Sequence, residues 1–427
     1  MQEMSTQLIL SAVIFIVAYA LIIWDKIDRT IVALMGATLM ILLNIISQQN
    51  AFHHIDLNTI ILLVSMMIIV MIVKRTGVFE YLAVSTVKIA KGEPIKILIL
   101  LSLITGILSA FLDNVTTILL MLPVMLSIAK DLKINPIPFI ISSVFASNVG
   151  GTATLIGDPP NIMIGSAVGL SFLDFLENLG VIIFLMLILT TGIFAFVYRG
   201  LLSTTDECKM KAMSIDGKSC IKDKTLLKKS LFILIITILG FVFHGMLHYE
   251  SATVALIGAV LLLFISGENI EEIFCEVEWK TIFFFSGLFM MVGGIQQTGA
   301  IKLIAEGVLN VTNGDLLLTT IAILWVSAIA SAFIDNIPFV ATMIPMIQNM
   351  GEISGMDLAP IWWALALGAC LGGNGTIIGA SANVIAIGIS EQNGYKITFG
   401  QFFKLAFPVM ILTIVISTVY IYFVYLV

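Results

Sequence analysis

Charged residues are scarce in this chain of 427 residues: Asp, Glu, Lys and Arg make up 11% of it, whereas hydrophobic residues make up 59%. Soluble globular domains carry roughly a quarter charged residues, so this composition excludes a water-soluble enzyme or nucleic-acid-binding protein. Cysteine and histidine are also rare, with four of each, and neither clusters at metal-ligand spacing. We therefore expect an all-α integral membrane protein without a disulfide framework and without a cofactor other than a bound Na⁺.

Several sequence blocks recur in the second half of the chain at one constant offset. FLDNVTTILLMLP at Phe111 returns as FIDNIPFVATMIP at Phe333, and GGTATLIGDPPN at Gly150 returns as GGNGTIIGASAN at Gly372. The two halves therefore align through these blocks without an insertion or deletion. Apolar residues match cheaply in any membrane protein, but these blocks also keep Asp, Asn, Pro and Gly in one register. The chain is therefore predicted to be an internal duplication.

The duplication predicts a first repeat at 1–199, a cytoplasmic linker at 200–229 and a second repeat at 230–427. Hydropathy and breaker residues predict apolar segments at about 8–24, 30–46, 58–73, 97–129, 137–170 and 179–198, and then at 230–247, 252–266, 281–295, 318–350, 361–390 and 404–427. The fourth segments, 97–129 and 318–350, exceed one crossing of about 20 residues and contain an Asp-Asn pair, which predicts re-entrant helical hairpins. The fifth segments, 137–170 and 361–390, are predicted to be broken helices.

Loop charges predict how the repeats lie across the membrane. Five crossings and one hairpin per half is an odd count, so the halves should be inverted relative to each other. An outside N-terminus places 20 of the 21 Lys and Arg residues, including the linker lysines, on the cytoplasmic side and leaves only Lys302 outside. The first segment lacks the features of a signal peptide, and we expect it to be retained in a multi-pass protein of the plasma or inner membrane.

Three carboxylates, Asp113, Asp158 and Asp335, fall at the breaks of the apolar segments. Inserting an aspartate into the middle of a membrane helix costs about 2.5 kcal/mol or more of free energy, so each of the three is a functional candidate. Asp158 has no counterpart in the second repeat, where Ala380 stands, which marks it for the proton- or cation-carrying step. No Lys or Arg falls inside a predicted span, so the site is expected to favour a cation, a neutral solute, or an anion that travels with Na⁺ or H⁺.

The remaining candidates are small polar residues beside the same breaks. Ion or proton coupling is predicted for Asp113, Asn114, Thr116, Asp158, Asp335 and Asn336, with Na⁺ at the Asp113-Asn114 and Asp335-Asn336 hairpin tips. Substrate contact is predicted for Ser147, Asn148, Gly151, Thr152, Thr154, Asn161, Gly373, Asn374, Thr376, Ser381 and Asn383. Asn114, Asn161 and Asn383 are expected to cap the half-helices that they begin.

The motifs FLDNVTTILLMLP, SNVGGTATLIGDPPN, FIDNIPFVATMIP and ALGACLGGNGTIIGASANVIAIGISEQNGY resemble the ion transporter superfamily. The similarity spans about 30–405 and is strongest to the branch that contains the arsenite-pump membrane subunit and the melanosomal P protein. It implies a homodimer with elevator-like movement, and arsenite pumps suggest a cytoplasmic ATPase partner that no residue here supports. Related sodium–dicarboxylate symporters carry Ser-Asn-Thr at both tips, whereas this chain has Asp113-Asn114 with Thr116, and Asp335-Asn336 without a following threonine.

The first functional hypothesis is a cation-coupled secondary transporter of a small anion or neutral oxyacid, of the arsenite or anion permease type. The alternative is a Na⁺/H⁺ antiporter, which three acids without a base fit equally well. An ion channel and an intramembrane aspartyl protease are more remote. The protease hypothesis predicts a Gly-x-Gly-Asp motif, whereas Leu155, Ile156 and Gly157 precede Asp158.

Overall fold

A computed structural model describes residues 2–24, 26–214, 217–247 and 249–427. Its elements in the first part of the chain are α1 (Gln2–Trp24), α2 (Arg29–Leu42), α3 (Gln48–His53), α4 (Leu57–Arg75), α5 (Val78–Ile89), α6 (Pro94–Phe111), α7 (Asn114–Asp131), α8 (Ile137–Gly151), α9 (Pro159–Val168), α10 (Phe172–Phe175), the π-helical turn η1 (Leu176–Gly180), α11 (Val181–Tyr198), α12 (Asp206–Met213) and the 3₁₀ turn η2 (Gly217–Cys220).

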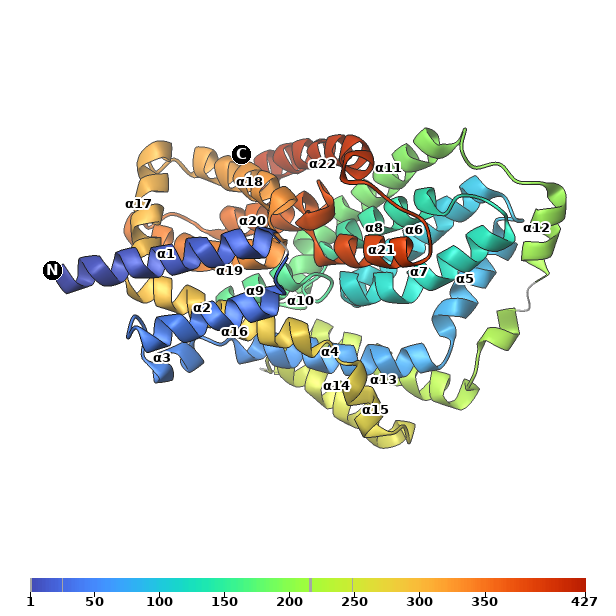
Figure 1. Cartoon of the computed structure of the whole chain (residues 1–427), viewed down its shortest axis with the longest axis horizontal. Coiled ribbons are helices and arrows are strands. Elements are labelled where there is room, and N and C mark those ends of the chain that lie inside the picture. Colours follow the sequence, from blue (N-terminus) through green and yellow to red (C-terminus); the bar gives the residue numbers. More distant parts are fainter. Residues whose placement is uncertain (1, 25, 215–216, 248) are drawn as a thin grey trace.

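The second part contains α13 (Lys224–Leu247), α14 (Ser251–Ser266), α15 (Ile270–Glu276), α16 (Trp279–Gln297), α17 (Ala300–Thr312), α18 (Leu316–Phe333), α19 (Asn336–Ser354), α20 (Ala359–Gly372), the 3₁₀ turn η3 (Ile377–Gly379), α21 (Ser381–Gln392), α22 (Phe399–Ile421) and the π-helical turn η4 (Tyr422–Leu426). Most helices run along the long axis of the molecule, and the N-terminus and α12 lie at its opposite ends (Figure 1).

The helix bounds repeat with the same offset as the sequence blocks. Helices α4 and α16 begin at Leu57 and Trp279, and α7 and α19 begin at Asn114 and Asn336, with identical spacing. The pairs α1 and α13, α2 and α14, α6 and α18, α8 and α20, and α9 and α21 also begin at equivalent positions of the two repeats. The duplicated sequence therefore builds the same succession of helices twice.

The predicted segments match these elements at the breaks and differ at their ends. Asp113 and Asp335 interrupt 97–129 and 318–350 as expected, and both broken helices are present. The predicted linker 200–229 contains α12 and η2, and α13 begins within it at Lys224; its positions 215 and 216 lie outside the described residues. The short helices α3, α5, α15 and α17 were not expected, since they are too short or too polar to stand out in hydropathy.

The protein is an all-helical, multi-pass membrane protein. Among the described residues, 8 helices are long and apolar enough to cross a bilayer, or up to 9 if α16 and α17, which meet at 72°, count as one span. Helices α2, α8, α14 and α20 have 14 to 16 residues and fall short of a full crossing.

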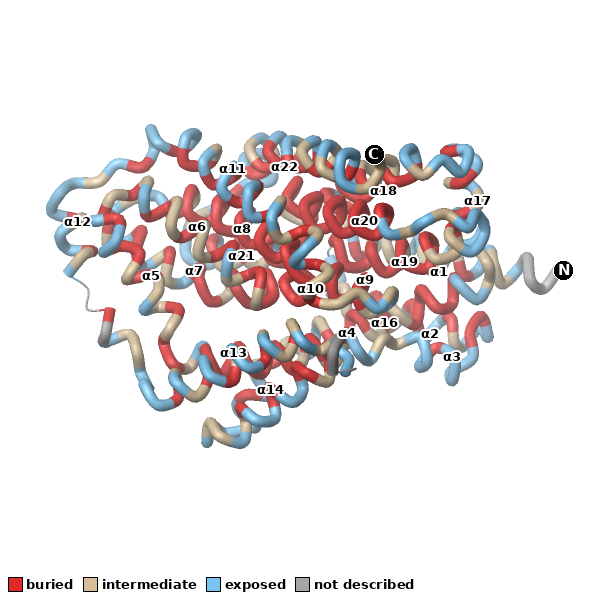
Figure 2. The backbone as a smooth tube through the Cα atoms, turned by 180° about the vertical axis from the view of Figure 1, so that it is seen from behind, coloured by how far each residue is buried: buried red, intermediate tan, exposed pale blue. Residues whose placement is uncertain are grey.

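The core lies around α8 and α20. Helix α8 is buried at every position from Pro138 to Gly151, and α20 from Pro360 to Gly372. Figure 2 shows these two helices with α21 and α9 at the buried centre, while exposed positions are frequent on α1, α11 and α22. A helix that is buried on all sides in a membrane protein is shielded from lipid, so it can carry the polar residues of a transport site.

Glycines allow α8 to pack directly against α6. A Cβ on Gly150 would lie 1.9 Å from the carbonyl oxygen of Gly106, closer than any real contact. In the second repeat, a Cβ on Gly372 would lie 2.5 Å from the carbonyl oxygen of Ala328. Small residues at such crossings let helix backbones approach in lipid, where no hydrophobic effect drives association.

We predict that Gly150→Ala destabilises the protein. The added methyl group must push α6 and α8 apart, and overpacking of this kind costs about 1–3 kcal/mol. The measurement is the thermal melting of detergent-purified protein. Gly192→Ala is the matched control, since a Cβ there meets nothing within 4 Å; equal melting temperatures for both variants would contradict the close packing.

Candidate functional site

The two Asp-Asn breaks share one local structure. After α6 and α18 end, two residues with extended backbone follow, Leu112-Asp113 and Ile334-Asp335. Asp113 Oδ1 accepts a hydrogen bond from Thr116 N at 2.8 Å, and Asp335 Oδ1 accepts one from Ile337 N at 3.1 Å. These aspartates therefore cap α7 and α19, the role that had been expected of Asn114. The Asn114 side chain instead donates to Asn148 Oδ1 at 3.2 Å.

Asp158 differs from the other two aspartates because it does not cap its helix. It precedes α9 with extended backbone, makes no side-chain cap hydrogen bond, and is followed by Pro159 and Pro160, which have no N–H to offer. Asp158 is 1% exposed, and Asn336 Nδ2 lies 3.4 Å from each of its carboxylate oxygens. Ala380 occupies the equivalent place before α21, with similar backbone angles.

Asparagine side chains satisfy the unwound backbone between the half-helices. Asn161 Nδ2 donates to the carbonyl oxygens of Thr152 and Thr154 at 3.1 and 2.9 Å. Asn383 Nδ2 donates to those of Gly373 and Thr376, both at 2.8 Å. The expectation that these two asparagines cap the following helices is thus wrong: their amides face carbonyls left over from the preceding half-helix, which lipid cannot hydrate.

Asn148 connects the two repeats at the centre of this network. Its Nδ2 donates to Asn383 Oδ1 at 2.8 Å and to Asn374 Oδ1 at 3.0 Å, while its Oδ1 accepts from Asn114. Asn148 is fully buried, with an exposed fraction of 0%. The break regions of both halves are therefore held side by side by amide hydrogen bonds.

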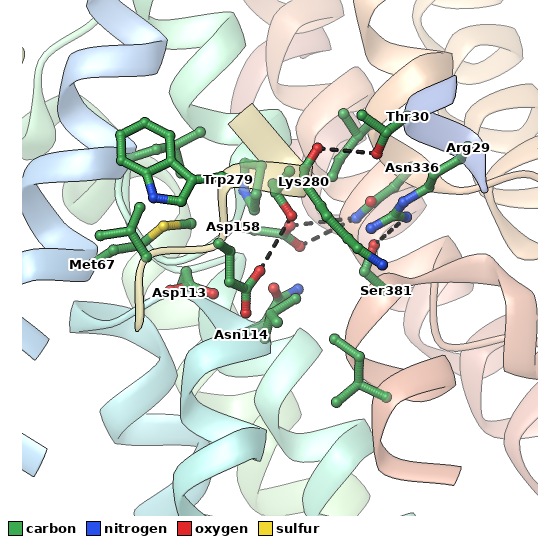
Figure 3. A pocket seen from close by; sticks show the side chains of 18 of the residues that line it. Arg29, Thr30, Met67, Asp113, Asn114, Asp158, Trp279, Lys280, Asn336 and Ser381 are labelled. Atoms are coloured by element: carbon green, nitrogen blue, oxygen red, sulfur yellow. Dashed lines mark hydrogen bonds between the residues drawn. The ribbon is translucent and has the colours of Figure 1, made fainter. Parts of the chain in front are cut away.

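A cavity of about 410 Å³ lies on one side of this network. Its lining includes Asp113, Asn114, Asp158, Asn336 and Ser381 from the breaks. Figure 3 shows the labelled side chains from these breaks around a common space, together with residues from the starts of α2 and α16. The volume falls in the range of small-molecule sites, about 300–1,000 Å³.

The site contains a base that sequence reasoning placed outside it. Arg29, the first residue of α2, extends its side chain to the second repeat, where Nη1 lies 2.7 Å from Asp335 Oδ2 and 2.7 Å from Ser381 Oγ. The conclusion that the site has no fixed base is therefore wrong. Arg29 lies one residue before a predicted span and was counted as a loop charge, yet an arginine at a helix end reaches several ångströms past its own backbone.

The mouth of the cavity is bounded by the starts of α2 and α16. Lys280 Nζ lies 3.2 Å from Asp28 Oδ2, and Thr30 Oγ1 donates to the Lys280 carbonyl at 3.1 Å. Glu278 also lines the cavity and accepts a hydrogen bond from Thr281. Within the described residues, Asp113, Asp158 and Glu278 form no ion pair, so acids remain in excess.

The predicted residues separate into two groups. Asp113, Asn114, Asp158, Asn336 and Ser381 line the cavity; Asp335 lines a smaller adjoining pocket beside Arg29, and the Thr116 hydroxyl donates to Asp113. The residues in the network behind the cavity, outside its lining, are Ser147, Asn148, Gly151, Thr152, Thr154, Asn161, Gly373, Asn374, Thr376 and Asn383. The described residues hold no group of three or more His, Cys, Asp or Glu suited to a metal ion.

Comparison with known families decides the class of protein. Residues 19–368 match the CitMHS family model, whose description is "Citrate transporter". The chain belongs to the CitMHS family. It is therefore a membrane transporter and not an enzyme, and the expected relationship to the P protein is confirmed by the relatives below.

Relatives of this CitMHS transporter span most of its length. It is 41% identical over 425 residues to an uncharacterized transporter of Mycobacterium bovis, covering 98% of this chain and 99% of that one. It is 32% identical over 507 residues to the human P protein, covering 98% of this chain but 60% of the P protein. The fold resembles that of the Alcanivorax borkumensis YdaH transporter, with a TM-score of 0.61, 14% identity, and coverage of 88% of this chain and 87% of that one.

We predict that Asn383→Ala lowers the thermal stability of the transporter. The change removes the amide donor from the carbonyl oxygens of Gly373 and Thr376 and one of the two acceptors of the Asn148 amide. A buried polar group left unsatisfied costs about 1–3 kcal/mol. The check is a melting curve of purified protein beside Asn393→Ala, whose exposed amide donates to the Ile389 carbonyl. An Asn383→Ala variant as stable as Asn393→Ala would contradict the role of the network.

Proposed function

We propose that this CitMHS transporter couples the movement of a proton to that of a small anion, with citrate as the first candidate. The observation that carries the proposal is one cavity that places an unpaired carboxylate, Asp158, near a guanidinium, Arg29. The carboxylate provides a place for the proton and the guanidinium a place for the anion. The family's description as citrate transporters supports a carboxylate substrate.

The surroundings of Asp158 favour a proton over Na⁺. A buried carboxylate without an ionic partner needs a proton or a cation to neutralise it. Asn336 turns its N–H donors toward Asp158 at 3.4 Å, whereas a Na⁺ ion would require oxygen ligands there. At the other tip, Arg29 already neutralises Asp335, which opposes a Na⁺ ion beside Asp335-Asn336.

Arg29 is the group best placed to bind the anion. Arginine presents a planar fork of donors that matches a carboxylate. Here a single nitrogen, Nη1, engages Asp335 and Ser381, and Arg29 also lines the main cavity. A substrate carboxylate that enters the cavity would compete with Asp335 for this guanidinium. Lys280, at the mouth, adds a second positive charge along the entry path.

The architecture supports alternating access by two inverted repeats, each with a re-entrant hairpin and a broken helix. The cavity opens between the starts of α2 and α16. The equivalent places in the other half, the starts of α14 and α4, border a separate pocket of about 290 Å³ with Leu155 and Ile162 in its lining and none of the aspartates. Access from one side only is the arrangement expected of a transporter in one of its two states.

The orientation in the membrane follows from charge. The cavity mouth lies among basic residues that the positive-inside rule assigns to the cytoplasm, together with the 200–229 linker. In this proposal the structure is the inward-open state, α6–α7 enters from the cytoplasm and α18–α19 from outside. The homodimer and the elevator-like movement belong to the proposal through the family resemblance.

A Na⁺/H⁺ antiporter is the second candidate, because acids exceed bases around the cavity. Both candidates are tested in proteoliposomes loaded with a pH-sensitive dye. The proposal predicts that external citrate acidifies the lumen and that an inward proton gradient accelerates radiolabelled citrate uptake. Arsenite and succinate serve as competitors that define the anion. Sodium uptake driven by a pH gradient without any anion would overturn the proposal in favour of the antiporter.

We expect Asp158→Asn to abolish citrate-dependent proton flux while the protein stays folded. The amide keeps the size of the side chain but cannot take up a proton, and no ion pair is lost. Dye fluorescence in proteoliposomes measures the flux, and melting curves verify folding. Asp357→Asn, at an exposed loop position, is the control. Normal proton coupling in Asp158→Asn would remove Asp158 from the mechanism.

Arg29→Gln should weaken citrate binding more than it slows turnover. Loss of a charge-assisted hydrogen bond of about 1.5–3 kcal/mol corresponds to a rise in KM of roughly 10- to 100-fold. Arg29→Lys keeps the charge without the planar fork and should fall between Gln and wild type. Arg199→Gln, at an exposed arginine stacked on Phe196, is the matched control. An unchanged KM in Arg29→Gln would exclude Arg29 from the anion site.

A further inference from the structure

The residues before α4 and α16 occupy equivalent positions of the two repeats but have diverged. Asp56 precedes α4, and Glu278 precedes α16. Asp56 is an N-cap: its carboxylate accepts hydrogen bonds from Asn58 N at 3.0 Å, from Thr59 N at 3.3 Å and from the Thr59 hydroxyl at 2.6 Å. A capping aspartate of this kind stabilises the first turn of a helix.

Glu278 does not perform that role. Its side chain is longer by one methylene, makes no cap hydrogen bond with α16, and keeps only a 3.2 Å contact to the Thr281 hydroxyl, the counterpart of Thr59. Glu278 does not bond to the end of α16 and instead lines the main cavity. Asp56, by contrast, is absent from the lining of the corresponding pocket at α4. The second repeat has therefore exchanged a capping carboxylate for one in the transport cavity.

The position of Glu278 lies between the solution and the buried carboxylates. Its neighbours Trp279 and Lys280 are exposed, Trp279 by 44% and the Lys280 side chain by 84%. The charged groups that share the cavity with it are Asp28 and Arg29 at the start of α2, Asp113 before α7, Asp158 before α9 and Lys280 on α16. Asp28 and Lys280 pair with each other, so the field at Glu278 is set mainly by the Asp113 carboxylate and the Arg29 guanidinium.

These surroundings make Glu278 sensitive to pH near neutrality. Burial, with a smaller contribution from the negative charge of Asp113, raises the pKa of Glu278 to about 7, while the hydrogen bond from Thr281 and the charge of Arg29 oppose the shift. Glu278 is therefore neutral below about pH 7 and ionised above it. When ionised, it adds a negative charge to a cavity that must receive an anion.

We propose that Glu278 is a second proton-binding group of the transporter, which couples proton uptake to anion binding at Arg29. The protonated carboxyl admits the anion, and the ionised carboxylate repels it and competes for the guanidinium. One proton passes from water at the cavity mouth to Glu278 when the anion binds, and it returns to water when the anion leaves. This inference rests on the proposed anion and proton transport and adds a residue and a pH dependence to it.

The first test is independent of substrate. Infrared difference spectra of wild type against Glu278→Gln are recorded as a function of pH without any anion. The expected result is a protonated-carboxyl band that titrates between pH 6 and 8 around the midpoint of about 7 and is missing in the variant. The absence of such a difference band would overturn the proposal whatever the substrate is.

The second test separates Glu278 from the proposed function. In wild type, the KM for citrate should rise above pH 7, by up to about tenfold per pH unit for one obligatory proton, relative to Glu278→Gln at the same pH. Because both proteins are measured at the same pH, the ionisation of citrate itself changes both KM values equally and has no effect on their ratio. Glu278→Asp shortens the side chain to that of Asp56 and keeps the carboxylate. In this variant the pH dependence of KM should no longer have a midpoint near pH 7.

The control is Asp56→Asn, which removes the equivalent carboxylate of the first repeat. It should keep the cap, because the asparagine oxygen accepts the same backbone N–H groups, and leave the pH profile of citrate uptake unchanged. A wild-type pH dependence that persists in Glu278→Gln overturns the role of Glu278 and leaves proton-coupled transport standing. Citrate uptake in wild type that is indifferent to pH and to proton gradients overturns both.

Discussion

The structure depends on one constraint: backbone that leaves the helix at membrane depth must find its hydrogen bonds inside the protein. The stretches after α8 and α20 expose carbonyl groups that water cannot reach, and Asn161 and Asn383 donate to two of them each. Because every donor must itself be buried, the broken helices lie against each other at the centre, where Asn148 joins both halves. The cavity forms beside this network.

The same constraint explains why two helices that supply no lipid-facing surface occupy the core. Helices α8 and α20 are enclosed by α6, α18 and their neighbours, and glycines at the contact faces permit a separation that larger residues would prevent. Close packing excludes lipid from the breaks, which lets aspartates and asparagines remain there. The aspartates that interrupt the apolar segments are thus gathered at one place.

The duplication produces the arrangement of helices, and the residues that differ between the two repeats provide the charged groups of the cavity. Asp158 stands where the second repeat has Ala380, Arg29 where it has Ser251, and Glu278 where the first repeat has Asp56. Each substitution adds a titratable or charged group to one cavity, and the equivalent pocket on the other half lacks all three. A symmetric scaffold can offer a similar path to both sides of the membrane, while the asymmetric residues bind what crosses.

Much of the frame could be predicted from the chain. Helix breaks can be recognised locally, because Asp-Asn pairs, Gly and Pro interrupt long apolar runs, and the repeat offset indicates each break twice. Arg29 could not be found this way, since a charge beside a span predicts a loop in every hydropathy argument. The asparagine roles were misassigned for a related reason: the position after a break indicates a cap, but the partner of an amide depends on which carbonyl the fold brings near it.

The membrane class, the duplication and the intramembrane aspartates were therefore determined by the sequence itself, through composition and spacing. The pairing of Arg29 with Asp335, the release of Glu278 into the cavity and the asparagine network were decided only by tertiary structure, because each joins residues that are far apart in the chain or separates residues that the repeat makes equivalent.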